Sequence, residues 1–137
     1  MTFSDSIAYC FRHYADFNGR ATRSEFWWFF LFCSLITVAL SVPATILLIV
    51  AVANSGSGTG IALVVISVVM FVIAFGFSLA TLVPTWAVGC RRLHDKGFSG
   101  WLQLIQLVSP GIVALWVLWA LEGDTEANQY GPVATRS

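Results

Sequence analysis

The chain has 137 residues, of which 58% are hydrophobic and 10% are charged, and its formal net charge is zero. An ordinary soluble domain carries charge on about a quarter of its residues. Residues 26–90 contain no Asp, Glu, Lys, Arg or His, whereas about 20 apolar residues suffice to cross a bilayer. The composition excludes a soluble globular protein and predicts an all-α integral membrane protein. The balanced charge gives no indication of a nucleic-acid partner.

The first 17 residues are predicted to form an amphipathic helix. Phe3, Ile7, Phe11 and Tyr14 recur at helical spacing, and this spacing places their apolar side chains on one face. A helix of this kind either lies in the plane of the membrane interface or packs on the cytoplasmic ends of the membrane-spanning helices. The sequence favours neither arrangement over the other.

Turn-forming residues divide the long apolar run into two predicted membrane helices. The segment 54–60, Asn-Ser-Gly-Ser-Gly-Thr-Gly, predicts a tight turn between spans over residues 26–53 and 61–88. Before the first span, Thr22 and Glu25 have the spacing of a capping box, in which two side chains satisfy the first backbone amides of a helix. These two spans are therefore expected to form an antiparallel helical hairpin.

A third apolar segment, residues 101–121, is just long enough to cross a bilayer. Ser109, Pro110 and Gly111 at its middle favour a break. A complete crossing is expected because neighbouring helices can satisfy the backbone groups that a proline frees, and a re-entrant hairpin is the alternative. These alternatives place the polar tail, residues 122–137, on opposite sides of the membrane. The predicted fold is a small bundle of three transmembrane helices, the third with this re-entrant alternative.

Basic residues are distributed unevenly around the predicted spans. The turn between the first two spans has none, and Arg136 lies in the tail. The others occur before the first span and in the predicted loop 89–100: Arg12, Arg20, Arg23, Arg91, Arg92 and Lys96. Segments rich in Lys and Arg stay on the cytoplasmic side of a membrane. The distribution therefore predicts a multi-pass protein with a cytoplasmic N-terminus.

The predicted loop contains the densest group of polar residues in the chain. Gly97 is expected to stop the second helix and Ser99 to cap the next. Basic residues beside a membrane bind anionic headgroups, and Trp favours the interface. We expect a basic cytoplasmic face that binds anionic lipid or a membrane-protein partner, with these candidates: Arg20, Arg23, Glu25, Arg91, Arg92, His94, Asp95 and Trp101.

Two other functions stay open beside this non-enzymatic one. Hydroxyl residues at helical spacing, such as Ser41 and Ser78, can line a solute path in a homo-oligomer, although such residues more often bond to backbone carbonyls. His94 titrates near neutral pH and can serve as acid or base in an enzyme that modifies headgroups. Cys90 and His94 are four residues apart, but two ligands do not make a metal site. No metal or cofactor is therefore expected.

Three motifs in the chain resemble those of a known family. They are Gly19-Arg20 followed by Arg23-x-Glu25-Phe26-Trp27, the long run Arg91-Arg92-Leu93-His94-Asp95-x-Gly97-x-Ser99-Gly100-Trp101, and Asn128-x-Tyr130-Gly131 in the tail. The chain resembles the small bacterial inner-membrane proteins of domain of unknown function 805, the YhaH/YhaI type. It departs from that pattern at Leu102, where a second Trp is usual, and at Ala127 and Pro132 in the tail.

The resemblance covers most of the chain and implies a helical protein of the bacterial inner membrane, with no established activity. It suggests that the three polar elements meet in space. If the tail lies across the membrane from the basic residues, only the first two elements can meet, with Glu25 pairing with Arg91 or Arg92. If the third segment is re-entrant, Asn128, Tyr130 and Gly131 join them.

Overall fold

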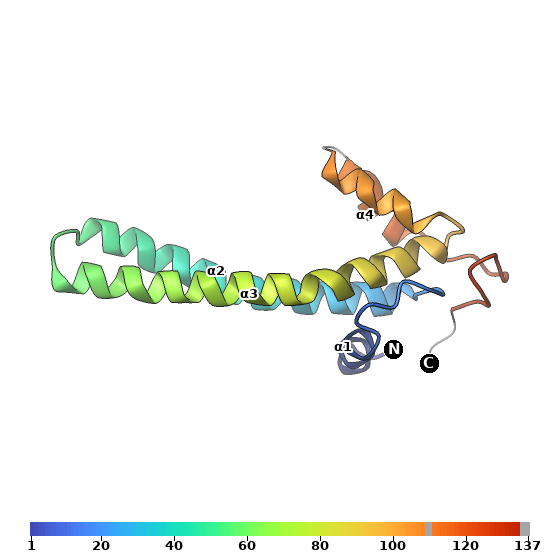
Figure 1. Cartoon of the computed structure of the whole chain (residues 1–137), viewed down its shortest axis with the longest axis horizontal. Coiled ribbons are helices and arrows are strands. Elements are labelled where there is room, and N and C mark those ends of the chain that lie inside the picture. The colour runs from blue at the N-terminus through green and yellow to red at the C-terminus, as the bar shows by residue number, and fades with distance from the viewer. Residues whose placement is uncertain (109–110, 135–137) are drawn as a thin grey trace. The chain divides into compact units, whose positions relative to one another are not determined.

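The computed structural model describes residues 1–108 and 111–134, and within them every regular element is a helix. In chain order these are α1 (Phe3–Arg12), α2 (Arg23–Ala53), α3 (Gly58–His94), the 3-10 helix η1 (Gly100–Leu107) and α4 (Gly111–Ala120) (Figure 1). The chain divides into two compact units. The hairpin unit is Phe32–Thr81, and the terminal unit contains residues 1–31 and the described residues from 82 onward.

The hairpin unit consists of the later part of α2, a short turn and the first part of α3. The rings of Phe32 and Phe77 pack edge to face with their centroids 6.0 Å apart. At the turn, the Ser57 hydroxyl accepts a hydrogen bond from the Gly60 amide at 3.0 Å. The predicted turn is confirmed, and it is shorter than expected because this hydroxyl cap lets α3 begin at Gly58.

Helices α2 and α3 contain 31 and 37 residues, and both are long and apolar enough to cross a membrane. At 1.5 Å per residue they measure roughly 46 and 56 Å, which exceeds a hydrocarbon core of about 30 Å. Some of their hydroxyl groups bond within their own helix: Thr45 donates to the carbonyl of Ser41 at 2.8 Å and Ser78 to that of Ala74 at 2.9 Å. These two bonds satisfy the hydroxyls of Thr45 and Ser78 without a polar path.

Helix α3 continues beyond the predicted end of the second span and finishes at His94. Arg91 and Arg92 therefore lie on its last turn, and not in a loop over residues 89–100 as expected. The negative end of the helix dipole favours cations at this position, which explains the extension. Gly97 then adopts a left-handed conformation with φ +72°, so its predicted role in stopping the helix is confirmed.

Residues 101–121 do not form the single continuous helix that was expected. They divide into η1 and α4, which contact each other (Figure 1). At Gly111, an added Cβ would collide with the backbone carbonyl of Ile105. Ser109 and Pro110, where the break was expected, lie outside the described residues. Because α4 has ten residues, it is roughly 15 Å long, too short to cross.

Helix α1 is shorter than the predicted segment of 17 residues and spans Phe3–Arg12. A complete capping box begins it: the Thr2 side chain accepts from the Asp5 amide, and the Asp5 carboxylate accepts from the Thr2 amide. The hydrogen bond from the Thr2 hydroxyl holds the pKa of Asp5 below its ordinary value, because it stabilises the ionised carboxylate. The box therefore fixes where α1 starts.

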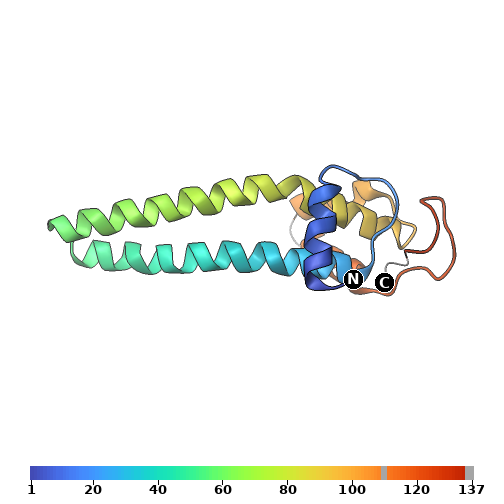
Figure 2. The same cartoon turned by 90° about the horizontal axis from the view of Figure 1, so that it is seen from below.

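Two aromatic contacts hold α1 across the first turns of α2 (Figure 2). The ring of Phe3 packs edge to face on Trp28 with centroids 5.7 Å apart, and Phe11 packs on Phe29 at 5.4 Å. Phe3 and Phe11 each keep 39% of their surface exposed. The helix thus adopts the packed arrangement, one of the two expected, and still presents apolar surface.

We predict that Gly111→Ala destabilises the contact between η1 and α4. The new methyl group meets backbone, which cannot rotate away, and overpacking of this kind costs about 1–3 kcal/mol. The melting temperature of the protein purified in detergent should fall by several degrees.

Gly76→Ala is the matched control, because a Cβ at Gly76 meets no atom within 4 Å. It should melt at the wild-type temperature or slightly higher, since Ala favours a helix. Identical melting of the Gly111→Ala variant and the wild type would contradict the tight packing of η1 on α4.

Candidate functional site: a buried ion cluster beside a cavity

The terminal unit contains a buried cluster of charged side chains centred on Asp95. The Asp95 carboxylate accepts from Arg20 Nε at 2.8 Å through one oxygen and pairs with Arg92 through the other. Arg20 and Asp95 are 75 residues apart in the sequence. All three residues are buried, with at most 4% of their surface exposed. Buried charges are tolerated only when paired and hydrogen-bonded, so this carboxylate fixes both guanidinium groups in place.

The remaining donors of Arg20 bind the backbone of the tail. Its Nη1 donates to the carbonyl of Glu126 at 2.7 Å and approaches that of Gly131 at 3.5 Å, while Nη2 donates to that of Asp124 at 2.6 Å. A guanidinium group offers five N–H donors in a rigid planar fork. A single side chain from the segment before α2 therefore holds the tail at three points.

Arg92 makes a similar set of bonds to the end of α4. It donates through Nε to the carbonyl of Trp119 at 3.1 Å and through Nη2 to that of Leu121. These are among the last carbonyls of a helix, which lack partners within it. The indole of Trp119 in turn donates to the carbonyl of Gly89 on α3 at 3.2 Å. The C-terminal end of α4 is thereby attached to the last turns of α3.

Glu25 and Arg91 form a second buried ion pair beside this cluster, with 2.7 Å between Oε1 and Nη1. The expected pairing of Glu25 with an arginine of the second motif is therefore confirmed. The guanidinium also lies 5.5 Å from the ring centroid of Tyr9 on α1, within reach of a cation–π contact. Thr22 accepts from the Glu25 amide at 3.2 Å, as expected of a helix cap. The pair joins the beginning of α2 to the end of α3.

These contacts show that most of the arginines expected on an exposed basic face are buried. Arg20, Arg91 and Arg92 are 3%, 1% and 1% exposed, so their charges are internal to the terminal unit. The reason is that each guanidinium faces a carboxylate within its own fold. Of the basic candidates, Arg23 lies at the surface, 3.3 Å from Glu122 in an exposed pair. Exposed pairs of this kind are worth about 0–1 kcal/mol.

The tail motif meets His94, the last residue of α3. The ring of Tyr130 stacks on that of His94 with a centroid distance of 3.9 Å and an interplanar angle of 4°. The side chain of Asn128 donates to the His94 carbonyl at 2.9 Å, and the backbones of Asn128 and Gly131 form an isolated bridge. All three polar elements therefore meet, as expected for a re-entrant third segment.

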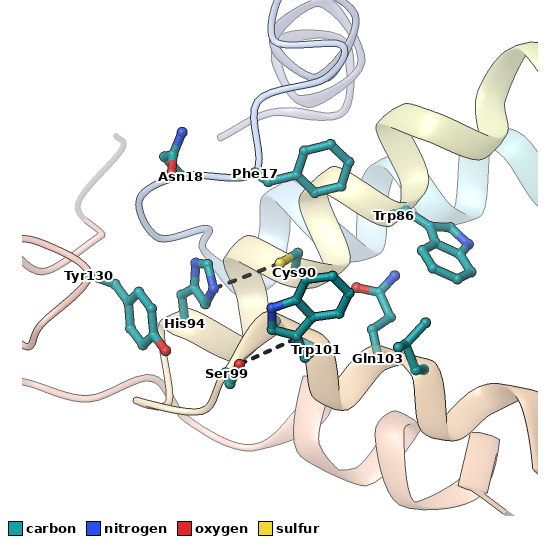
Figure 3. Close-up of a pocket in the computed structure, with 11 residues that line it drawn as sticks. Phe17, Asn18, Trp86, Cys90, His94, Ser99, Trp101, Gln103 and Tyr130 are labelled. Atoms are coloured by element: carbon teal, nitrogen blue, oxygen red, sulfur yellow. Dashed lines mark hydrogen bonds between the residues drawn. The ribbon is translucent and has the colours of Figure 1, made fainter.

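A cavity of about 450 Å³ lies between the end of α3, η1, the segment before α2 and the tail (Figure 3). Its polar groups include Cys90, His94 and Gln103, and Trp101 at its edge is 79% exposed. Its volume falls within the roughly 300–1,000 Å³ of small-molecule sites. Aromatic and apolar side chains make up much of the wall: Phe17, Trp86, Trp101, Leu104 and Tyr130.

The sequence identified three wall residues, His94, Trp101 and Tyr130, as candidates and missed others. Phe17 and Asn18 reach the cavity because Arg20 and Gly19, which follow them, bond to Asp95 and His94. A Phe beside a turn-forming Asn-Gly pair is common in loops, so no local pattern marks these residues. Ser99 caps η1 by accepting from the Trp101 amide at 3.4 Å, as expected.

We predict that Asp95→Asn strongly destabilises the terminal unit. The substitution leaves two buried guanidinium groups without their shared counter-charge, and breaking a buried pair costs about 3–5 kcal/mol. Melting in detergent should begin at a markedly lower temperature, and trypsin should cleave at Arg92 and Lys96 much faster.

The control is Asp124→Asn, which removes the carboxylate of a partly exposed pair with Lys96 at 3.4 Å. It should change stability by less than about 1 kcal/mol. Equal melting and cleavage of the Asp95→Asn and Asp124→Asn variants would refute the central role of Asp95.

The sequence of the chain was compared with those of known protein families and proteins. The sequence model of the protein of unknown function DUF805 matches residues 14–132. The chain is 31% identical over 121 residues to the inner membrane protein YhaI of Escherichia coli K12, covering 88% of this chain and 86% of YhaI. It is 30% identical over 122 residues to the inner membrane protein YhaH of the same organism, covering 88% of each chain.

No solved structure matches the chain. The family match includes the arginines, carboxylates and tail residues of the cluster, which all lie between residues 14 and 132. The named relatives are inner membrane proteins, and this chain has two helices that are long and apolar enough to cross a membrane. The chain belongs to the DUF805 family, an uncharacterised family with relatives in the bacterial inner membrane.

Proposed function

We propose that this protein is a multi-pass protein of the bacterial inner membrane that binds the acyl chain of a lipid in the cavity of its terminal unit, without converting it. The observation that carries the proposal is a cavity of about 450 Å³ with aromatic walls at the ends of two helices suited to crossing a membrane. Aromatic walls with a few polar groups are typical of sites for small, largely apolar ligands.

The position of Trp101 supports a lipid ligand in particular. Its side chain is 79% exposed at the cavity edge, and Trp is enriched where membrane proteins meet the lipid headgroups. Leu107 on the same 3-10 helix is 73% exposed. Exposed apolar groups of this size are stable in contact with lipid and costly in water. A lipid chain can therefore pass from the bilayer to the cavity along η1.

The proposal includes a topology. α2 and α3 cross the membrane, and the segment formed by η1 and α4 enters only the cytoplasmic leaflet, because α4 is roughly 15 Å long. The N-terminal segment and the end of α3 are cytoplasmic by the distribution of Lys and Arg. The tail is bonded to Arg20 and therefore lies on the cytoplasmic side too. α1, with its exposed Phe3 and Phe11, lies at the same interface.

The charge of the lipid headgroup is expected to contribute little to the affinity of this binding. The three buried arginines face the two carboxylates of Glu25 and Asp95 within the unit, so only one positive charge is left uncompensated there. At the surface, Arg23 and Lys96 face acidic partners as well. Anionic and zwitterionic lipids should therefore bind with affinities that differ by less than about tenfold, or about 1.4 kcal/mol.

We predict that Trp101→Ala weakens lipid binding about tenfold, because loss of an aromatic anchor costs about 1–2 kcal/mol. The measurement is native mass spectrometry of the detergent-purified protein titrated separately with phosphatidylglycerol and phosphatidylethanolamine. Both lipids should give a one-to-one complex with the wild type.

Leu107→Ala is the matched control, because Leu107 is a similarly exposed residue of η1 outside the cavity wall. It should bind lipid as the wild type does. Equal loss in both variants would show that general membrane contact, and not the cavity, holds the lipid. Absence of a one-to-one complex in the wild type would reject the proposed function.

A further inference from the structure

Cys90 and His94 form a pair of side chains in the cavity that lipid binding does not require (Figure 3). They lie one helical turn apart on α3, with 3.7 Å between Cys90 Sγ and His94 Nε2. Both are partly exposed, so a ligand in the cavity can reach them. A thiol next to an imidazole nitrogen is the arrangement that activates a cysteine nucleophile.

The other ring nitrogen of His94 fixes which atom can accept the thiol proton. His94 Nδ1 lies 3.1 Å from the backbone carbonyl of Gly19. A carbonyl can only accept, so Nδ1 carries the proton and Nε2 of the neutral ring has its lone pair free toward Cys90. The parallel stack on Tyr130 at 3.9 Å holds the ring in this orientation. His94 is therefore placed as a general base.

The wall opposite the thiol is built without a side chain at Gly100. An added Cβ there would collide with Cys90 Sγ and come within 3.1 Å of His94 Nε2. The start of η1 thus approaches the pair closely while the aromatic walls surround it. A mostly apolar site disfavours a permanent thiolate, so the proton must leave the sulfur as a new bond forms. This requirement makes the neighbouring base necessary.

We propose that Cys90 is an acyl acceptor, which His94 activates to take a long-chain acyl group from a thioester donor whose chain lies in the cavity. Sγ adds to the donor carbonyl while His94 Nε2 takes the thiol proton. The donor carbon–sulfur bond then breaks, and the departing thiol takes the proton from His94. One thioester and one thiol are consumed, and one thioester and one thiol are formed, so no oxidant or reductant is needed. The inference rests on the proposed function, since the same cavity holds the chain.

The test incubates the full-length protein in detergent with palmitoyl-coenzyme A or with the palmitoyl thioester of acyl carrier protein, and follows the intact mass. The wild type should gain one acyl group that hydroxylamine removes. Cys90→Ala should gain none, and Cys33→Ser should react as the wild type does. Reaction with one donor or with both supports the proposal and identifies the source. Reaction with neither donor, or equal labelling of the Cys90→Ala variant, overturns it.

The His94→Asn variant tests whether His94 acts as a general base or has only a structural role. The Asn amide can still donate to the Gly19 carbonyl, but it offers no basic nitrogen to Cys90. General-base catalysis contributes about 10²–10⁴-fold, so acylation should slow by at least tenfold. Burial lowers the pKa of the His94 imidazole below its ordinary value, so the wild-type rate should already level off at mildly acidic pH. The variant rate should continue to rise with hydroxide. Identical pH profiles overturn the role of His94.

Lipid titration of the same proteins distinguishes this inference from the proposed function. The wild type and Cys33→Ser, whose changed residue does not line the cavity, should both form the one-to-one phosphatidylglycerol complex. Lipid binding without acylation would reject the acyl-acceptor role alone. Acylation of Cys90 without a one-to-one lipid complex would reject the lipid-binding function and leave the thiol chemistry in place.

Discussion

The buried carboxylate of Asp95 is the group on which the terminal unit depends. It pairs with Arg20 from the segment before α2 and with Arg92 from the end of α3. The other donors of these arginines bind carbonyls of the tail and of the end of α4. One carboxylate thus holds together the segment before α2, the end of α3, and the end of α4 with the tail that follows it. A hydrophobic contact would lack this directional control, because burial of apolar surface is non-directional.

The same interactions form the cavity. Arg20 holds the preceding residues beside α3, where the Gly19 carbonyl orients His94. The bonds from Arg92 to the end of α4 hold the segment that packs on η1, and η1 supplies Trp101 and Gln103 to the wall. The charged cluster therefore positions the segments whose aromatic side chains form the cavity wall, and no arginine is among the residues that line the cavity in the described structure.

Much of this arrangement was predictable from local patterns. The apolar run and the Gly- and Ser-rich turn predicted the helical hairpin, and Gly97 and Ser99 marked the end of one helix and the start of the next. The pairing of Glu25 with Arg91 followed from opposite charges at adjacent helix ends. The burial of Arg20 was not predictable, because apart from Asp95 its partners are backbone carbonyls up to 111 residues away. A sequence does not show which backbone carbonyls accept hydrogen bonds from side chains. A buried arginine bound to such carbonyls therefore cannot be distinguished in the sequence from an arginine on the surface.

The side of the membrane on which the tail lies tests the account most directly. Reporters that are active only in the cytoplasm or only in the periplasm can be fused in turn to each end of the full chain. If Arg20 holds the tail and Arg92 holds the end of α4 as described, the cytoplasmic reporter will be active at both ends and the periplasmic reporter at neither. A periplasmic C-terminus with a cytoplasmic N-terminus would contradict the buried cluster, because the tail could not then reach Arg20.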